Sequence, residues 1–215
     1  MTTHLHSAPA PGFVHLRLHS EYSVVDSLIR IEDLVAKVAE LGMPAVALTD
    51  HTNFYALIKF YTAAAAAGIK PVCGCDLFVA EDDNPDQVSL LVLLVKDRTG
   101  YSNLIELISR AYREGQYRGT VAIRRSWLQG KTAGLIALSG AARGDVGQAL
   151  LGDDLPQARS ALAFWQQLFP DRFYLELQRT GRAGDAEHVQ RAVKLALELG
   201  CPVVATNDVR FLSQF

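Results

Sequence analysis

Short apolar runs alternate with segments of helical periodicity along most of this chain. Strands are predicted at residues 13–20, 45–48, 69–79, 88–95, 135–138, 173–178 and 202–206. Helices are predicted at residues 31–41, 54–67, 101–112, 144–151, 155–169 and 185–199, with a short turn or helix at 124–128. This alternation is typical of a parallel α/β sheet with right-handed crossovers, either open or closed into a barrel. The run 88–95 is almost wholly apolar, which favours a parallel strand covered on both faces.

The predicted strand Ala45–Leu48 ends in a group of polar residues at 49–53. In barrels and open α/β sheets, ligands bind where the carboxyl ends of the strands meet, because the loops that leave the strands converge there. Asp50 and His51 are therefore candidates for a metal or phosphate site. The alternative is that Asp50 caps the following helix and His51 is a solvated loop residue.

Polar residues also lie at the ends of other predicted strands. They are Arg17 and His19, Asp76, Glu176 and Gln178, and Asn207 and Asp208. Within the segment 13–20, His15, Arg17 and His19 share one face, either in a strand that faces a polar cavity or in an edge strand with a solvated face. Several strands with apolar interiors end in polar groups. This pattern predicts an active site, or the remains of one, at the end of the sheet or barrel where these strand ends meet.

Composition argues against several classes of function. The 215 residues are 49% hydrophobic and 20% charged, which suits one large globular domain or a piece of a bigger one. A formal net charge of −2 gives no overall basic field for direct binding of nucleic acid. No window has the apolar length of a membrane span and no signal-peptide pattern opens the chain, so a cytoplasmic location without membrane contact is expected. Cys73, Cys75 and Cys201 match no common disulfide or zinc spacing, which favours buried thiols in a reducing compartment.

Residues 1–12 are predicted to be a flexible N-terminal tail, because they contain two prolines and several small residues without periodicity. His4 and His6 do not form a metal motif there, since no strand is predicted to hold them. The ordered domain is expected over residues 13–215.

Six segments of the chain carry a family pattern. They are 15–20 (HLRLHS), 48–51 (LTDH), 68–71 (GIKP), 99–104 (TGYSNL), 134–140 (GLIALSG) and 204–208 (VATND). Together and in this order they resemble the polymerase and histidinol phosphatase (PHP) domain, and more narrowly the PHP domain at the N-terminus of bacterial DNA polymerase III alpha subunits of the proteobacterial type. The resemblance implies a distorted (β/α)7-type PHP barrel, truncated at the C-terminus, in which 13–215 is an incomplete domain of a much longer polymerase chain. That parent chain would be a DNA-directed DNA polymerase, a nucleotidyltransferase of chromosomal replication that uses magnesium, and no polymerase catalytic residue is expected in this fragment.

The resemblance also implies a metal site, because active PHP domains hold up to three ions, commonly zinc or manganese, on His, Asp, Glu and sometimes Cys. Matching ligand positions are His19, Asp50, His51 and Asp208, while Asp76 stands where Glu is usual and Glu176 keeps a carboxylate. Lost positions are Arg17, Leu90, Thr180 and Arg210, which stand where the family has histidine, and Ala141, which stands where it has cysteine. A guanidinium group never ligates a metal, so Arg17 and Arg210 are predicted to form salt bridges with Asp50, Asp76 or Asp208 instead.

Three hypotheses for function follow. The leading one is a degenerate, metal-free phosphoesterase domain that supports the polymerase core and docks the proofreading exonuclease (epsilon) subunit, with DNA bound only through the full-length polymerase. The second is residual metal-dependent phosphoesterase or pyrophosphatase activity with one zinc or manganese ion on His19, Asp50, His51 and Asp208. The third, from the strand and helix pattern alone, is an unrelated α/β-barrel hydrolase.

The surface for the exonuclease subunit is expected in the segment 112–127. This segment contains Tyr112, Tyr117, Arg118 and Trp127, which are residue types enriched in interface anchors. The alternative is that these side chains pack internally or lie in a solvated loop.

Overall fold

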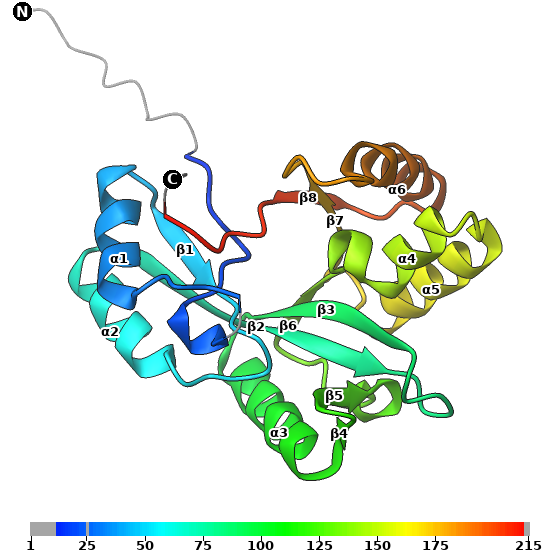
Figure 1. The fold of residues 1–215 in the computed structure, drawn as a ribbon, viewed down its shortest axis with the longest axis horizontal. Coiled ribbons are helices and arrows are strands. Elements are labelled where there is room, and N and C mark those ends of the chain that lie inside the picture. The colour runs from blue at the N-terminus through cyan, green and yellow to red at the C-terminus, as the bar shows by residue number, and fades with distance from the viewer. Residues whose placement is uncertain (1–11, 25, 213–215) are drawn as a thin grey trace, which may run out of the picture.

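The computed structural model describes residues 12–24 and 26–212 of the chain (Figure 1). Its strands are β1 (Ala45–Leu48), β2 (Lys70–Ala80), β3 (Val88–Val95), β4 (Gln116–Tyr117), β5 (Thr120–Arg124), β6 (Leu135–Leu138), β7 (Phe173–Gln178) and β8 (Val203–Thr206). Its α-helices are α1 (Ile31–Glu40), α2 (Leu57–Ala66), α3 (Arg98–Glu114), α4 (Asp145–Leu151), α5 (Leu155–Leu168) and α6 (Asp185–Leu199). Short 3₁₀ helices are η1 (Glu21–Ser23), η2 (Arg125–Leu128) and η3 (Ala141–Arg143). The predicted tail lies outside the described residues, except for Gly12.

The helices and most strands lie close to the predicted bounds. The helix α3 begins earlier than predicted because the carboxylate of Asp97 accepts hydrogen bonds from the backbone N–H groups of Thr99 and Gly100 at 2.9 and 3.1 Å. The strands β4 and β5 were not predicted. No helix in the described part of the chain is both long and apolar enough to span a membrane.

The sheet is mixed, which corrects the prediction of a wholly parallel sheet. Its strands follow the order β4-β5-β2-β3-β6-β7-β8, and β1 pairs with the first residues of β2. The pairs β1/β2, β2/β5, β6/β7 and β7/β8 are parallel, whereas β3 is antiparallel to both β2 and β6. The parallel strand predicted at 88–95 is wrong because the connection 81–87 is too short for a crossover and forms a hairpin loop. The strand is nevertheless covered as expected, since residues 89–94 are all buried.

Residues 15–19 close the barrel, although they do not form the regular strand that was predicted. On one side, the backbone N–H of Ala47 in β1 donates to the carbonyl oxygen of His15 (2.8 Å). On the other side, the N–H of His19 donates to the carbonyl oxygen of Val209, just after β8 (3.0 Å). These contacts complete a ring of this segment, β1, β2, β3, β6, β7 and β8, the distorted barrel that was expected (Figure 1).

Two large apolar clusters hold the helices against the sheet. The larger one packs α3, α4, α5 and α6 on β2, β3, β6 and β7, and Trp165, Phe169 and Phe173 are among its largest side chains. The smaller one packs α1 and α2 on β1 around Ile31 and Phe60. In Figure 1, α1 and α2 lie on one side of the barrel and α4, α5 and α6 on the other, and we call these two groups the lobes, while α3 lies below the sheet.

Candidate functional site

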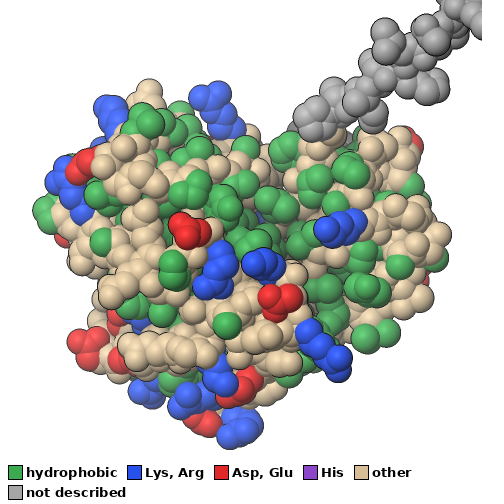
Figure 2. All heavy atoms as spheres, turned by 180° about the vertical axis from the view of Figure 1, so that it is seen from behind, with side chains coloured by type: hydrophobic (Ala, Val, Ile, Leu, Met, Phe, Trp, Pro, Cys, Tyr) green, Lys and Arg blue, Asp and Glu red, His purple; other side chains and the backbone are tan. Residues whose placement is uncertain are grey.

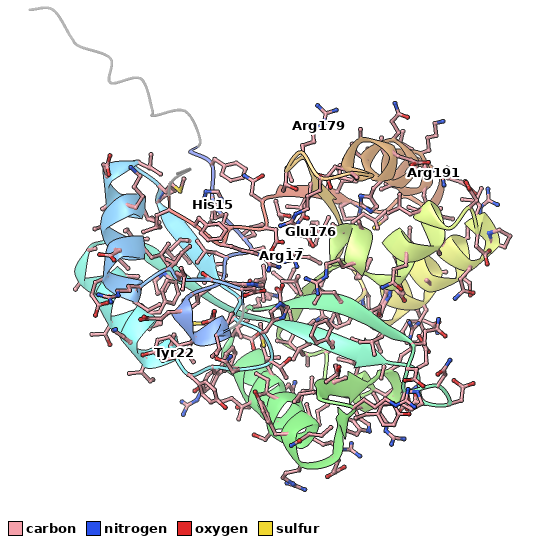
Figure 3. All side chains as sticks on the ribbon, viewed as in Figure 1. His15, Arg17, Tyr22, Glu176, Arg179 and Arg191 are labelled. Carbon is pink, nitrogen blue, oxygen red and sulfur yellow. The ribbon has the colours of Figure 1, made fainter. Side chains whose placement is uncertain are left out.

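Charged side chains from separate parts of the chain meet inside the barrel, between the two lobes. We call eight of them the mouth cluster: Arg17, His19, Asp26, His51, Asp76, Glu176, Asp208 and Arg210. They come from residues 15–19 and the following loop, from the ends of β1 and β7, from β2 and from the residues after β8. Figure 3 shows Arg17 and Glu176 lying next to each other where the lobes meet. The structure thus brings together seven of the eight predicted site residues, all except Asp50.

Arg17 is the centre of the mouth cluster and is only 1% exposed. Its Nε donates to Asp76 Oδ2 at 2.8 Å, its Nη1 donates to Glu176 Oε1 at 3.5 Å, and its Nη2 lies 3.8 Å from Asp208 Oδ1. One guanidinium therefore hydrogen-bonds to carboxylates from β2 and β7 and lies within ion-pair distance of a third, in the segment after β8. These are the salt bridges predicted between Arg17 and the carboxylates of Asp76 and Asp208.

Asp26 pairs with the other basic side chains of the mouth cluster, and it was not predicted from the sequence. Its Oδ2 lies 3.3 Å from His19 Nδ1, 3.2 Å from His51 Nε2 and 2.6 Å from Arg210 Nη1. On the opposite side of the His19 ring, Nε2 lies 2.9 Å from Asp76 Oδ2. His19 is consequently held between two carboxylates, and Arg210 is paired in a way that the family pattern did not indicate.

Asp208 is surrounded by arginines. Both Nε and Nη2 of Arg210 lie 3.1 Å from its Oδ2, as the predicted salt bridge requires. Arg182, another residue missed from sequence, reaches in from the loop before α6 and donates from Nη1 to the same oxygen at 2.7 Å. Three arginines, counting Arg17, therefore face one carboxylate that is almost completely buried.

Asp50 has a different role, which corrects its predicted salt bridge with an arginine. Its Oδ1 accepts hydrogen bonds from the backbone N–H of Ser20 and from Ser23 Oγ, both at 2.7 Å. Its Oδ2 accepts from Ser20 Oγ, also at 2.7 Å. The serine groups thus satisfy both carboxylate oxygens, and Asp50 fixes the η1 turn that follows residues 15–19.

Glu176 lies on β7 with no exposed surface and is surrounded mainly by neutral donors. Its Oε1 accepts hydrogen bonds from Gln178 Nε2 at 2.8 Å and from Thr206 Oγ1. Burial raises the pKa of the Glu176 carboxyl, while Arg17 acts in the opposite direction. The neighbouring β7 and β8 side chains therefore hold this carboxyl in one orientation toward Arg17.

Burial and ion pairing shift the pKa values of His19, Asp76 and Asp208 in opposite directions. Burial lowers the pKa of His19, but the charges and hydrogen bonds of Asp76 and Asp26 outweigh it and raise the pKa to about 9. Burial raises the pKa of Asp76, but Arg17 and His19 outweigh it and hold this pKa well below the usual range. The arginines around Asp208 likewise outweigh its burial and lower its pKa. At neutral pH Asp76 and Asp208 are therefore buried carboxylates paired with arginines.

Three side chains of the mouth cluster are placed where they could ligate a metal ion. One donor atom from each of His19, His51 and Asp76 lies within 4.8 Å of the others, as the ligands of a single ion would. However, Asp76 Oδ2 already accepts from Arg17 Nε, and a guanidinium cannot ligate a metal. The arginines that face Asp76, Glu176 and Asp208 therefore do not fit a centre of several ions. The other oxygen of Asp76, Oδ1, has no hydrogen-bond partner among the described residues and stays available to a single ion.

Three other positions that were predicted to have lost a ligand have structural roles. Leu90 is buried in β3, and Ala141 is buried at the start of η3. The backbone N–H and Oγ1 of Thr180 donate to Asp185 Oδ2 at 2.7 and 2.9 Å, in the loop that leads into α6. These three residues thus have a packing or hydrogen-bonding role and lie apart from the mouth cluster's ion pairs.

Comparisons with known proteins agree with this fold. A model of the PHP domain matches residues 15–180. The chain is similar to DNA polymerase III subunit alpha of Pseudomonas aeruginosa, with 50% identity over 203 residues that cover 94% of this chain and 17% of that protein. The corresponding subunit of Escherichia coli is 48% identical over 202 residues, with the same coverage of each chain. This chain therefore spans about a sixth of the length of these relatives.

A solved structure gives the same architecture. It belongs to a candidate metal-dependent phosphoesterase from Bifidobacterium adolescentis, and the TM-score is 0.58 at 15% identity, covering 97% of this chain and 91% of that one. Identity this low shows a shared fold and nothing about shared chemistry.

Proposed function

The chain belongs to the PHP domain family, and on that premise we propose that it is the N-terminal PHP region of a bacterial DNA polymerase III alpha subunit. The identity to the two alpha subunits over nearly all of this chain supports the proposal. The parent chain would be the DNA-directed DNA polymerase of chromosomal replication in the cytoplasm. Its magnesium-dependent nucleotidyl transfer would belong to the part of that chain outside this region. The hypothesis of an unrelated α/β-barrel hydrolase is wrong, because the family match covers most of the chain.

Within that polymerase, the domain serves as a structural module whose phosphoesterase site has decayed. The observation that carries this proposal is the position of Arg17, whose guanidinium contacts Asp76, Glu176 and Asp208 in the place where a metal cluster would be held. Such a group supplies positive charge to the carboxylates permanently, whereas it offers no Lewis acid and no bound water for hydrolysis. The mouth cluster then stabilises the barrel instead of catalysing a reaction.

The domain also acts as a mount for the proofreading exonuclease (epsilon) subunit. Holding a second module on the polymerase raises its effective concentration at the primer end without new catalytic groups. A net charge of −2 suits a protein partner better than direct contact with DNA. DNA would be bound through the full-length polymerase.

The docking role is tested with the full-length alpha subunit and a variant that lacks residues 1–215. The purified exonuclease subunit is titrated against both by fluorescence anisotropy, and DNA synthesis on a primed template serves as the folding control. We expect the deletion to weaken binding at least about tenfold. Unchanged affinity in a variant that still synthesises DNA would leave the domain a scaffold only.

The second candidate function is a residual metal-dependent phosphoesterase or pyrophosphatase. It rests on the three donor atoms of His19, His51 and Asp76 that lie within 4.8 Å of one another, and not on the predicted set that included Asp50 and Asp208. Release of phosphate from pyrophosphate or p-nitrophenyl phosphate, measured with added zinc or manganese, tests this candidate. Activity that is lost in His51→Ala and kept in the surface variant Lys131→Ala would support it.

A further inference from the structure

The helix α2 is apolar on both its buried and its exposed faces. Phe60 and Ala64 face the core and have no exposed surface, whereas Ile58 and Tyr61 are 74% and 54% exposed. The only charged residue of the helix, Lys59, pairs with Glu32 of α1 at 3.0 Å. A helix that is hydrophobic all round is normally covered on all sides. The exposed side of α2 is therefore a candidate contact surface.

A groove runs between this side of α2 and the beginning of α3. Its volume is about 540 Å³, and Pro71, Cys73 and Val95 line it together with the α2 side chains. The groove exists because the ladder between β2 and β3 begins only at Gly74, and β3 is followed at once by the turn into α3. The first residues of β2 are consequently left without β3 beside them, and the two helices stand on either side of them.

An aromatic pair forms the wall on the α3 side. Tyr101 lines the groove and stacks on Phe54, with ring centroids 6.1 Å apart and an interplanar angle of 9°. Hydrophobic side chains gather on the lobe that carries α1 and α2 when the molecule is seen from behind (Figure 2). A preformed apolar groove of this kind loses little conformational entropy when it binds a partner.

The rim of the groove is positively charged. Lys96 and Arg98 line it, and neither forms an ion pair within the described residues 12–24 and 26–212. The only carboxylate between them, Asp97, is used to cap α3. The first turn of α3 adds a partial positive charge at the same edge. An apolar floor with a basic rim is complementary to an apolar segment that carries carboxylates.

We propose that this groove between α2 and α3 is the docking site for a peptide segment of a second protein. An aliphatic or aromatic side chain of that segment is seated between Ile58, Tyr61 and Tyr101, and a neighbouring carboxylate faces Lys96 and Arg98. The inference rests on the proposed role of the domain as a mount. It places the docking surface for the partner in the groove and not in the segment 112–127. That segment fits less well, because Trp127 is partly buried against the main core with the guanidinium of Arg110 4.0 Å from its ring centre, and Arg118 is paired with Asp86.

The test uses the full-length alpha subunit and the purified exonuclease subunit as the probe. Ile58→Glu with Tyr61→Glu places carboxylates on the apolar wall, and Lys96→Glu with Arg98→Glu reverses the rim. The matched control is Leu197→Glu on α6, because Leu197 is also exposed (80%) and apolar but lies outside the groove. We expect the wall variant to weaken binding by about 30-fold or more, the rim variant by about tenfold, and the control by less than about twofold.

A second measurement tests directly whether the bound partner covers the groove. Cys73 lines the groove and is partly exposed, whereas Cys75 and Cys201 are buried, so alkylation with iodoacetamide distinguishes it. Burial raises the pKa of the Cys73 thiol, and the reaction is therefore run at about pH 8.5. Saturating exonuclease subunit should slow the modification of Cys73 at least about fivefold, read by tandem mass spectrometry, and the wall variant should abolish this protection.

The outcomes separate the groove from the proposed function. Weakened binding in the wall and rim variants, together with protection of Cys73, supports the groove. If removal of residues 1–215 abolishes binding but the wall and rim variants bind normally, the groove is not the docking site, although the domain still mounts the exonuclease subunit. If that deletion leaves binding unchanged, both are overturned.

Discussion

The mouth cluster and the apolar cluster around Trp165 are equally buried but are held together by different forces. Arg17 and Trp165 are each 1% exposed. Trp165 packs among Phe169, Phe173 and the helices around it, so its stabilisation follows mainly from the apolar area it removes from water, with one further contact in which its Nε1 donates to Asp145. Arg17 contributes to stability only while its carboxylates are present and ionised. The difference shows that a cluster of buried charges can form part of a core, but that its stability then depends on its ion-pair partners and on pH.

The largest expected effect is that of removing Arg17. Arg17→Ala leaves the buried carboxylates of Asp76 and Glu176 without their arginine partner, and we expect the free energy of unfolding to fall by about 3 to 5 kcal/mol. Urea unfolding followed by circular dichroism measures this. The control is Arg159→Ala, which removes an exposed ion pair with Glu198 and should cost less than about 1 kcal/mol. Equal losses in the two variants would show that burial of the charge is unimportant.

A smaller effect, the coupling between partners, distinguishes the mouth cluster from an apolar core. The double variant Arg17→Met with Asp76→Asn should be more stable than the sum of the single losses predicts, by about 1 to 3 kcal/mol, because it removes both charges together. Arg17→Met with Asp50→Asn should be close to additive, since Asp50 is bound to Ser20 and Ser23 instead. The same urea titrations give both values, and strict additivity in the first pair would contradict the assigned partnership.

The smallest effect uses two buried histidines whose pKa values shift in opposite directions. The pKa of His19 is about 9, so its contribution is fully present below the unfolded value of about 6.5 and is lost as the pH rises through 9. Burial lowers the pKa of His188 despite Asp185, so protonation favours the unfolded chain and stability falls as the pH decreases below about 6.5.

Glutamine substitutions separate these two histidines. His19→Gln should reduce the loss of stability between pH 6.5 and 9, and His188→Gln should reduce the loss between pH 6.5 and 5, each by on the order of 1 kcal/mol. Unfolding free energies measured at the three pH values check this. A His19→Gln variant that keeps the full alkaline loss would show that His19 is not held as a cation by Asp76 and Asp26.

The sequence predicted the helices and most strands because their periodicity is strong, whereas two features of the sheet escaped it. The direction of β3 was mistaken because an apolar run shows burial on both faces but not strand polarity. The hairpin β4–β5 turns through Arg118 and Gly119, both with positive φ (48° and 81°). Asn or Asp before Gly commonly signals such a turn and Arg does not, so these short strands left little to recognise.

Within the site, the pattern identified which residues are present but not where each side chain points. Asp50 and His51 are adjacent at the end of β1, yet Asp50 is turned to two serines while His51 faces Asp26. Asp26 and Arg182 lie in loops without periodicity and reach the mouth cluster from outside the strands. Only the three-dimensional arrangement reveals contacts of this kind, because loop conformation determines them.

We propose that guanidinium groups have replaced metal ions in the mouth cluster. The most direct test is elemental analysis of the protein purified without chelator, combined with thermal unfolding in the presence and absence of EDTA. We predict well under one equivalent of zinc or manganese and an unchanged melting temperature with EDTA, because Arg17 and Arg210 already neutralise the carboxylates. Stoichiometric metal that EDTA removes, with a clear fall in melting temperature, would contradict the claim.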